Sequence, residues 1–283
     1  MRTSRLSVGV LVAVTLTLFA AATARADWNP GDPHKMHYPQ LPDLTPTGLD
    51  VLATRDPTST GPNGPLWKTL ADDFRCSQAG PISDIHFWGS WLNDQVFTGV
   101  QFKLSIHADV PAPPTGGFSR PAFPPLWERV LTPSAQRLYS TLPAASAPEQ
   151  FYNPNNNQIM GTDRQIWQYN FKDIVEPFTQ QEGTIYWLDV QAIIPDGLPF
   201  LFGWKTTNPT VTPHFNDDAV YWDTVLPGPG QPPLVGPFPL VYPAGHPFGG
   251  QSMDLAFVIT PEPGMVLFVT AGLIGLGLIR RRP

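Results

Sequence analysis

The sequence predicts an all-β protein, an antiparallel β-sandwich of jelly-roll type with about ten strands. Short apolar runs alternate with clusters of turn-forming residues, and 35 prolines and 24 glycines interrupt any long helix. No stretch longer than about ten residues repeats its apolar positions every 3.6 residues, as an amphipathic helix would. No internal repeat indicates a solenoid or a propeller.

The first 26 residues have the features of an export signal. Arg2 and Arg5 precede an apolar run, and Ala24 and Ala26 form a small-x-small cleavage motif. We therefore expect a signal peptide over residues 1–26.

An irregular arm is expected next. Residues 27–66 are rich in proline, glycine, aspartate and threonine, a composition typical of loops. One short strand is expected near residues 49–53.

The sandwich domain is expected over residues 67–260. Its expected strands are 67–76, 81–92, 100–110, 126–131, 136–142, 165–171, 184–194, 200–207, 219–223 and 252–259. Long loops are expected at 111–125, 143–162 and 227–247, where proline or asparagine is frequent.

The segment 100–110 shows the clearest alternation. Its apolar side chains share one face, and Gln101, Lys103, Ser105 and His107 share the other. A period of two predicts a half-buried strand with one wet face.

The chain ends in three features that occur in order. Pro261, Glu262 and Pro263 precede an uncharged segment, residues 264–279, and the cluster Arg280, Arg281 and Arg282 follows it. Sixteen residues of helix span roughly 24 Å, slightly less than a hydrocarbon core of about 30 Å. We expect a single membrane helix over 264–279, with the arginines on its cytoplasmic side.

This tail resembles the PEP-CTERM sorting signal. The resemblance implies that an exosortase, a membrane peptidase, processes the protein near the motif and passes it to the cell surface or extracellular matrix. The inner membrane of a Gram-negative-type cell would then hold the chain only transiently. An ordinary tail anchor is the alternative, but it does not require Pro-Glu-Pro.

Charge and cysteine content narrow the function classes. Residues 27–260 carry 11 lysines and arginines against 22 aspartates and glutamates. A body with this acidic balance and no basic cluster argues against nucleic acid as a partner. Cys76 is the only cysteine, so no internal disulfide forms, and a buried structural thiol is expected.

Two pairs of adjacent aspartates are candidate calcium ligands. They are Asp72 with Asp73 and Asp217 with Asp218, and Ca²⁺ prefers oxygen ligands. The alternative is that one member of each pair faces solvent and the other caps a turn. The absence of a regular Asp-x-Asp-x-Asp-Gly loop favours this alternative, with no cofactor at all.

Trp88, Trp91 and Trp222 are candidate sugar-stacking residues, because sandwich lectins bind the apolar faces of sugars on exposed rings. The alternative is that these rings fill the core or form cross-strand pairs.

No enzyme signature is present. The sequence has neither a Gly-x-Ser-x-Gly elbow nor a His-Glu-x-x-His pair. Asp84, Glu128 and Glu182 could in principle serve as the acid and base of paired-carboxylate hydrolysis, but nothing local marks them. We expect a protein that is not an enzyme.

The apolar and acidic segments of the body occur in a characteristic order. They include Leu70–Phe74, Ile82–Trp91, Ile185–Val190 and Asp254–Ile259. The series resembles an uncharacterised β-sandwich module of planctomycete-type exported proteins, which carries no known activity. The sequence thus predicts a structural or adhesive protein of the cell surface or matrix. The alternative is a carbohydrate-binding module, calcium-assisted, with extracellular polysaccharide as its partner.

Overall fold

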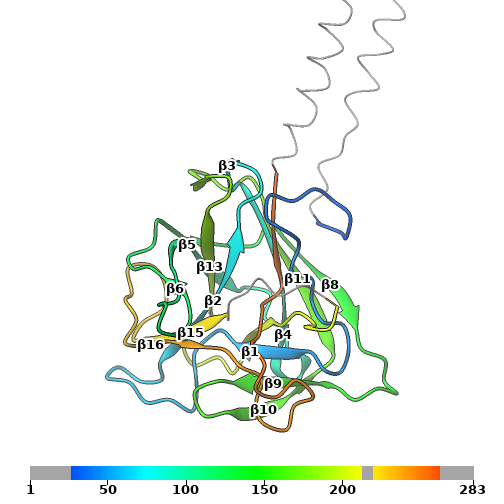
Figure 1. Cartoon of the computed structure of the whole chain (residues 1–283). Helices are drawn as coiled ribbons and strands as arrows, with labels where there is room; N and C mark the ends of the chain where they lie inside the picture. The colour runs from blue at the N-terminus through cyan, green and yellow to red at the C-terminus, as the bar shows by residue number, and fades with distance from the viewer. Residues whose placement is uncertain (1–26, 212–218, 262–283) are drawn as a thin grey trace, which may run out of the picture.

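The computed structural model describes residues 27–211 and 219–261, and this part of the chain is all-β (Figure 1). The all-β part of the prediction is therefore confirmed, but the strands β1 to β17 outnumber the ten or so expected. Among the described residues, none forms a helix that is long and apolar enough to cross a membrane. The expected signal peptide (1–26) and membrane helix (264–279) lie outside the described residues.

The first sheet has eight strands in the order β10-β9-β1-β14-β4-β11-β8, with β17 also paired to β4. Its strands are β1 (Leu49–Leu52), β4 (Asp84–Trp91), β8 (Ala135–Thr141), β9 (Glu149–Asn153), β10 (Gln158–Asp163), β11 (Gln165–Phe171), β14 (Phe202–Lys205) and β17 (Phe257–Thr260). Aromatic and β-branched residues dominate its central strands, as a pleated buried surface requires.

The second sheet has seven strands in the order β16-β15-β2-β13-β5-β6, with β7 also paired to β5. Its strands are β2 (Trp67–Arg75), β5 (Gln101–Val110), β6 (Arg120–Pro121), β7 (Trp127–Leu131), β13 (Ile185–Ile193), β15 (Val220–Thr224) and β16 (Val235–Pro239). A small third sheet pairs β3 (Gly80–Pro81) with β12 (Thr179–Gln180), and a 3-10 turn follows β4 at Leu92–Asp94.

The two large sheets enclose a common aromatic core. The ring of Phe102 on β5 lies 5.1 Å from the ring of Phe87 on β4 and 5.1 Å from that of Phe202 on β14. At another point, Phe74 of β2 meets Phe257 of β17. In Figure 1, β2, β13 and β5 lie on the left and β4, β11 and β8 on the right, with this interface between them. The architecture is thus sandwich-like.

One pair departs from the expected antiparallel pattern. Strand β1 is antiparallel to β14, with Asp50 opposite Lys205, but it is parallel to β9, with Leu49 opposite Gln150. About a hundred residues separate β1 from β9 in the chain, so no tight hairpin imposes an antiparallel arrangement. The expected short strand near residues 49–53 therefore becomes a buried inner strand of the first sheet.

Three of the expected loops contain strands. The segment 143–162 holds β9 and most of β10, 227–247 holds β16, and 111–125 holds β6. The proline-containing strands β6 and β16 both lie at edges of their sheet, where a missing N–H breaks no central hydrogen bond.

The expectation that the polar face of β5 is wet is wrong for three of its four residues, whereas Gln101 at the start of the strand is exposed as expected. Lys103, Ser105 and His107 are all buried. The loop between β6 and β7 covers this face, and a ring nitrogen of His107 lies 2.8 Å from the carbonyl oxygen of Ala122. Alternation correctly separated the two faces of the strand, but it could not show that a distant loop covers the polar one.

Candidate functional site: a buried carboxylate cluster

The first sheet brings three carboxylates together at one end. They are Asp50 on β1, Glu149 on β9 and Asp163 on β10, and one oxygen of each lies within 4.8 Å of the other two. The register explains the meeting, because Glu149 is directly opposite Asp163 and β9 also pairs with β1. All three side chains are buried, so this cluster is the candidate functional site.

A single ammonium group lies among the three carboxylates. Lys205 on β14 is opposite Asp50, and its Nζ atom lies 2.7 Å from Oε1 of Glu149 and 3.4 Å from Oδ2 of Asp50. Three ionised carboxylates and one ammonium leave a formal charge of −2. Buried charge of this size needs protons or a further cation.

Burial and mutual repulsion set the protonation of the cluster. Burial raises the pKa of Glu149 to about 8, with the Lys205 ammonium opposing the change. Burial, followed by the charge of Asp50, raises the pKa of Asp163 to about 10. Burial would lower the pKa of Lys205, but the surrounding carboxylates raise it above its ordinary value. The lysine is therefore charged, and protonation of Glu149 and Asp163 is favoured at neutral pH when no other cation is present.

Gly48 leaves the space that the cluster occupies. A Cβ atom at this position would overlap the Lys205 ammonium and come within 2.9 Å of Oε1 of Glu149. Any larger residue would displace the ion pair.

The predicted calcium ligands Asp72 and Asp73 lie elsewhere, on β2. Both are buried, so the expectation that one member faces solvent is wrong for this pair. Oδ2 of Asp72 accepts a hydrogen bond of 2.6 Å from the backbone N–H of Leu255. Burial, with the charges of Asp254 and Asp73, raises the pKa of Asp72 well above its usual range. Asp254 thus joins this second acidic group, although the sequence did not single it out.

The other predicted pair, Asp217 and Asp218, lies outside the described residues.

The three candidate sugar-stacking tryptophans are core residues. Trp88, Trp91 and Trp222 each have 0% of their surface exposed. Nε1 of Trp91 donates a 2.7 Å hydrogen bond to the hydroxyl of Tyr169, and Trp222 packs edge-on against Phe123. Sugar stacking needs an accessible ring face, so the hypothesis that these three residues form the platform is wrong for this structure.

One protein family matches residues 36–260, and it is described as Domain of unknown function (DUF7901). The chain belongs to this family. Comparison with curated proteins and with solved structures finds no match. The DUF7901 domain therefore includes the carboxylate cluster, both large sheets and most of the arm.

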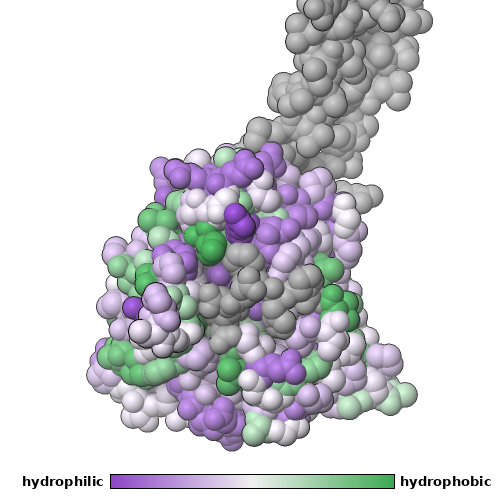
Figure 2. All heavy atoms as spheres, in the orientation of Figure 1, coloured by the Kyte–Doolittle hydropathy of each residue, from purple (hydrophilic) through white to green (hydrophobic). Residues whose placement is uncertain are grey.

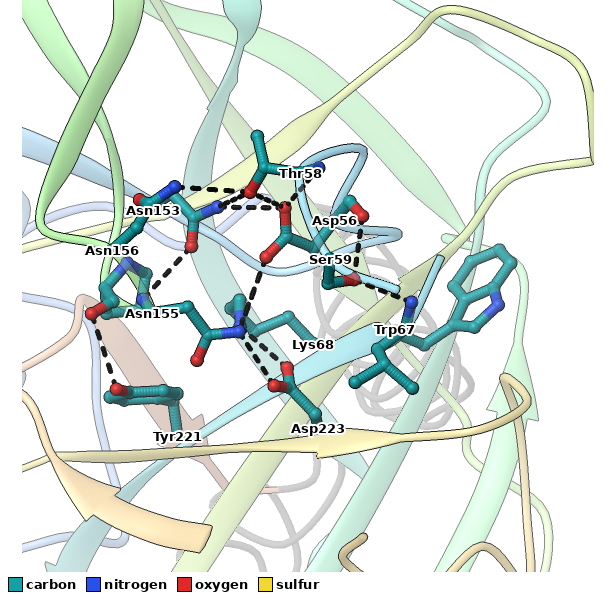
Figure 3. A network of polar contacts seen from close by, with 12 residues as sticks. Asp56, Thr58, Ser59, Trp67, Lys68, Asn153, Asn155, Asn156, Tyr221 and Asp223 are labelled. Carbon is teal, nitrogen blue, oxygen red and sulfur yellow. Dashed lines mark hydrogen bonds and ion pairs between the residues drawn. The ribbon is translucent and has the colours of Figure 1, made fainter. Parts of the chain in front are cut away.

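A second buried charge network of the DUF7901 domain ties a loop to the second sheet (Figure 3). Nζ of Lys68 on β2 lies 2.7 Å from Oδ1 of Asp223 on β15 and 3.8 Å from Oδ2 of Asp56. Asn155, in the turn between β9 and β10, donates a 2.8 Å hydrogen bond to Asp223, and Asn153, the last residue of β9, donates one of 2.9 Å to Asp56. Hydrogen bonds to two charged aspartates thus hold the asparagine-rich turn in place.

A third network lies on the polar face of β5. Oδ2 of Asp189 on β13 lies 3.0 Å from Nζ of Lys103 and 2.9 Å from Nε2 of His107. Both ring nitrogens of His107 are engaged, one by Asp189 and one by Ala122. This arrangement leaves the imidazole no free nitrogen with which to activate a nucleophile.

The three carboxylates that could in principle serve in hydrolysis lie on different elements. Asp84 begins β4 in the first sheet, Glu128 lies on β7 in the second sheet, and Glu182 lies in the turn before β13. Oε2 of Glu128 accepts a hydrogen bond from the backbone N–H of Gly230, which gives this carboxylate a structural partner.

Sequence reasoning missed the residues of the carboxylate cluster. One signal was available, because Asp50 interrupts the apolar run Leu49–Leu52 and Lys205 follows the apolar Phe202–Trp204. A charged residue inside an otherwise apolar strand is buried only with a partner. The pairing of Asp50 with Glu149 and Asp163 had no such signal, since it depends on the parallel contact of β1 with β9.

Proposed function

We propose that this DUF7901 protein is an exported, non-enzymatic structural or adhesive module of the cell surface or extracellular matrix. A PEP-CTERM tail would deliver it, with an exosortase-type peptidase as its processing partner. We further infer that the body is a β-sandwich of jelly-roll type and that residues 264–279 form a transient inner-membrane helix.

The observation that carries this proposal is the inward placement of the aromatic residues. Eight of the nine tryptophans are buried, and their rings pack the core and the covered outer faces. A lectin that binds by stacking would keep such rings accessible, whereas a scaffold uses them for packing.

The surface supports the same proposal. Figure 2 shows hydrophilic residues interspersed with small separate hydrophobic patches on the face in view. Exposed large apolar side chains are distributed over many loops, which is normal for a protein surface. The buried lysines Lys68, Lys103 and Lys205 are paired with interior carboxylates, as expected for a rigid module.

The sorting part of the proposal is tested in the tail. Replacing Pro261 and Glu262 by alanine leaves the apolar segment unchanged, so the chain should still enter the membrane. It should fail to reach the cell surface, because the motif that directs sorting is lost. Fractionation and surface labelling of a tagged chain in the native cell measure both steps.

The matched variant replaces Arg280, Arg281 and Arg282 by glutamine. It should impair membrane retention and processing, because the positive cluster no longer holds that end in the cytoplasm. Normal surface delivery of the Pro261/Glu262 variant would rule out sorting by this motif.

The structural role is tested with the full chain purified in mild detergent. We expect no selective binding to a broad polysaccharide panel, with or without calcium, and self-association in sedimentation analysis. Selective, saturable binding to one polysaccharide class would replace the scaffold with the carbohydrate-binding alternative.

A further inference from the structure

We propose that Asp50, Glu149 and Asp163 bind one calcium ion, a site distinct from the aspartate pairs that the sequence singled out. This inference goes beyond the proposed function and does not depend on it, because it concerns the interior of the first sheet.

The charge of the cluster matches a divalent cation. Three carboxylates and the Lys205 ammonium, which lies 2.7 Å from Glu149, leave −2 when all are ionised. One divalent cation brings the buried group to neutrality. Its donors are oxygens, which hard cations such as Ca²⁺ select.

The side chain of Asp163 provides evidence for a cation site that is independent of the net charge of the cluster. Its side chain is 2% exposed, and among the described residues neither of its carboxylate oxygens has a hydrogen-bond partner. A buried carboxylate with no donor is costly, by several kcal/mol for an isolated ion. Its oxygen nevertheless lies within 4.8 Å of oxygens of Asp50 and Glu149. The Asp163 carboxylate is therefore aimed at a position that it shares with Asp50 and Glu149. Only a proton or a cation at that position can compensate its charge.

The spacing of the oxygens suits calcium. Ca²⁺ binds oxygen at about 2.3–2.6 Å, so one ion reaches oxygens separated by up to about 5 Å. The buried hydroxyl of Ser90 lies beside Asp50 and offers a further oxygen. The ion would link β1 to the hairpin of β9 and β10, which is distant from β1 in the sequence.

Calcium titration of the full chain, stripped with a chelator and held in mild detergent, tests the site. Isothermal titration calorimetry should give one calcium per chain. Melting followed by tryptophan fluorescence should rise by roughly 5–10 °C at a calcium concentration a hundred times Kd. Asp163→Asn should weaken binding at least about tenfold, since even residues behind metal ligands contribute that much.

Two control variants locate the ion. Asp196→Asn changes a carboxylate whose side chain is 84% exposed, and it should bind calcium as the wild type does. Asp72→Asn alters the other buried acidic group and should also retain binding. If Asp72→Asn abolishes binding and Asp163→Asn does not, the ion lies on β2 and the proposal is wrong.

Hydrogen exchange of the wild-type chain provides a test that needs no variant to fold. Calcium should slow exchange in Leu49–Leu52, Glu149–Asn153 and Gln158–Asp163. The absence of any calcium heat and of any change in exchange would show that the cluster is neutralised by protons only, which overturns the proposal.

Discussion

At the scale of single residues, buried charges are the most informative feature of this molecule. Lys68, Lys103 and Lys205 each lie inside the protein against aspartate or glutamate. An interior charge is tolerated only while its partner is present. These lysines therefore connect segments that the apolar core alone would not fix in register.

The Lys68 network yields a stability prediction. Lys68→Met leaves Asp223 and Asp56 buried without their cation, and we expect it to lower the free energy of unfolding by about 3–5 kcal/mol. Urea unfolding followed by tryptophan fluorescence measures this change. The control is Arg55→Met, which breaks a pair with the exposed Asp196 and should cost no more than about 1 kcal/mol. A similar small loss for Lys68→Met would show that the network contributes little.

His86 yields a prediction of pH dependence. Its Nδ1 lies 2.6 Å from Oδ1 of Asn170 and its Nε2 lies 3.3 Å from Oγ1 of Thr260. Burial lowers the pKa of His86 from 6.5 to about 4, against the hydrogen bond that its Nδ1–H donates to Asn170, which raises the pKa. The nearby charges of Lys172 and Arg137 lower this pKa further, and that of Asp27 raises it.

The direction in which stability changes with pH follows from proton binding to the folded and unfolded chain. Below pH 6.5 the unfolded chain binds a proton at His86 that the folded chain does not, so stability is present above pH 6.5 and is lost as the pH falls towards 4. The full loss is roughly 3 kcal/mol. His86→Gln should therefore show a shallower fall in unfolding free energy between pH 6.5 and 4.5 than the wild type. Parallel curves for the two proteins would contradict the buried neutral histidine.

At the level of the strands, close packing between neighbouring strands limits which residues fit. Gly89 lies in the middle of β4, opposite Trp167 of β11 and Trp204 of β14. A Cβ atom there would overlap the Phe202 ring and the carbonyl oxygen of Gly203. The backbone of a central strand cannot move to relieve this overlap.

Gly89→Ala should therefore destabilise the fold, by at least about 1–3 kcal/mol for an overpacked core. Gly99→Ala is the matched control, because its added methyl group meets only the ring of Phe97, a side chain that can shift. It should change the unfolding free energy by less than about 0.5 kcal/mol. Equal stability of the two variants, measured by thermal melting and urea unfolding, would show that β4 can adjust.

Most strands of the two sheets could be predicted from the sequence. Those that could not be predicted were missed for a physical reason. The segment 165–171 was predicted with the bounds that β11 has, because an apolar and aromatic run stands between turn signals. Strands β9 and β10 were missed, because Asn153–Asn157 was interpreted as part of a long loop. In the structure this segment is the tight turn of a hairpin, anchored by hydrogen bonds to Asp56 and Asp223 that are distant in sequence.

At the scale of the whole molecule, the body closes with its last described strand. The side chains of β17 are all buried, and β17 pairs with β4 so that Phe257 lies opposite Phe87. The arm lies on its other side, where the backbone N–H groups of Lys35 and Gln40 donate to carbonyl oxygens of Ile259 and Phe257. The fold therefore needs the chain up to Thr260, immediately before the Pro261 motif.

This arrangement predicts that cleavage of the chain after Thr260 leaves the fold intact, whereas cleavage before Phe257 does not. A chain of residues 27–260 should melt cooperatively at nearly the wild-type Tm. A chain of residues 27–256 should show no cooperative transition, because it loses Phe257, Val258 and Ile259. Burying each of these side chains contributes ~1.5–3 kcal/mol, and together they are comparable with a whole domain's stability of about 5–15 kcal/mol. Cooperative melting of the shorter chain would show that β17 is dispensable.

The sequence alone was enough to predict the all-β class, most of the strand positions and the buried state of Cys76. These properties depend on local patterns, because a strand shows its period and its turn residues within about ten neighbouring positions. Three features became apparent only in the folded protein: β1 runs parallel to β9, Trp88, Trp91 and Trp222 face inwards, and Asp50, Glu149 and Asp163 meet around Lys205. Each of these depends on contacts between segments that are far apart in the chain, and no local pattern of residues specifies which distant strand will be the neighbour.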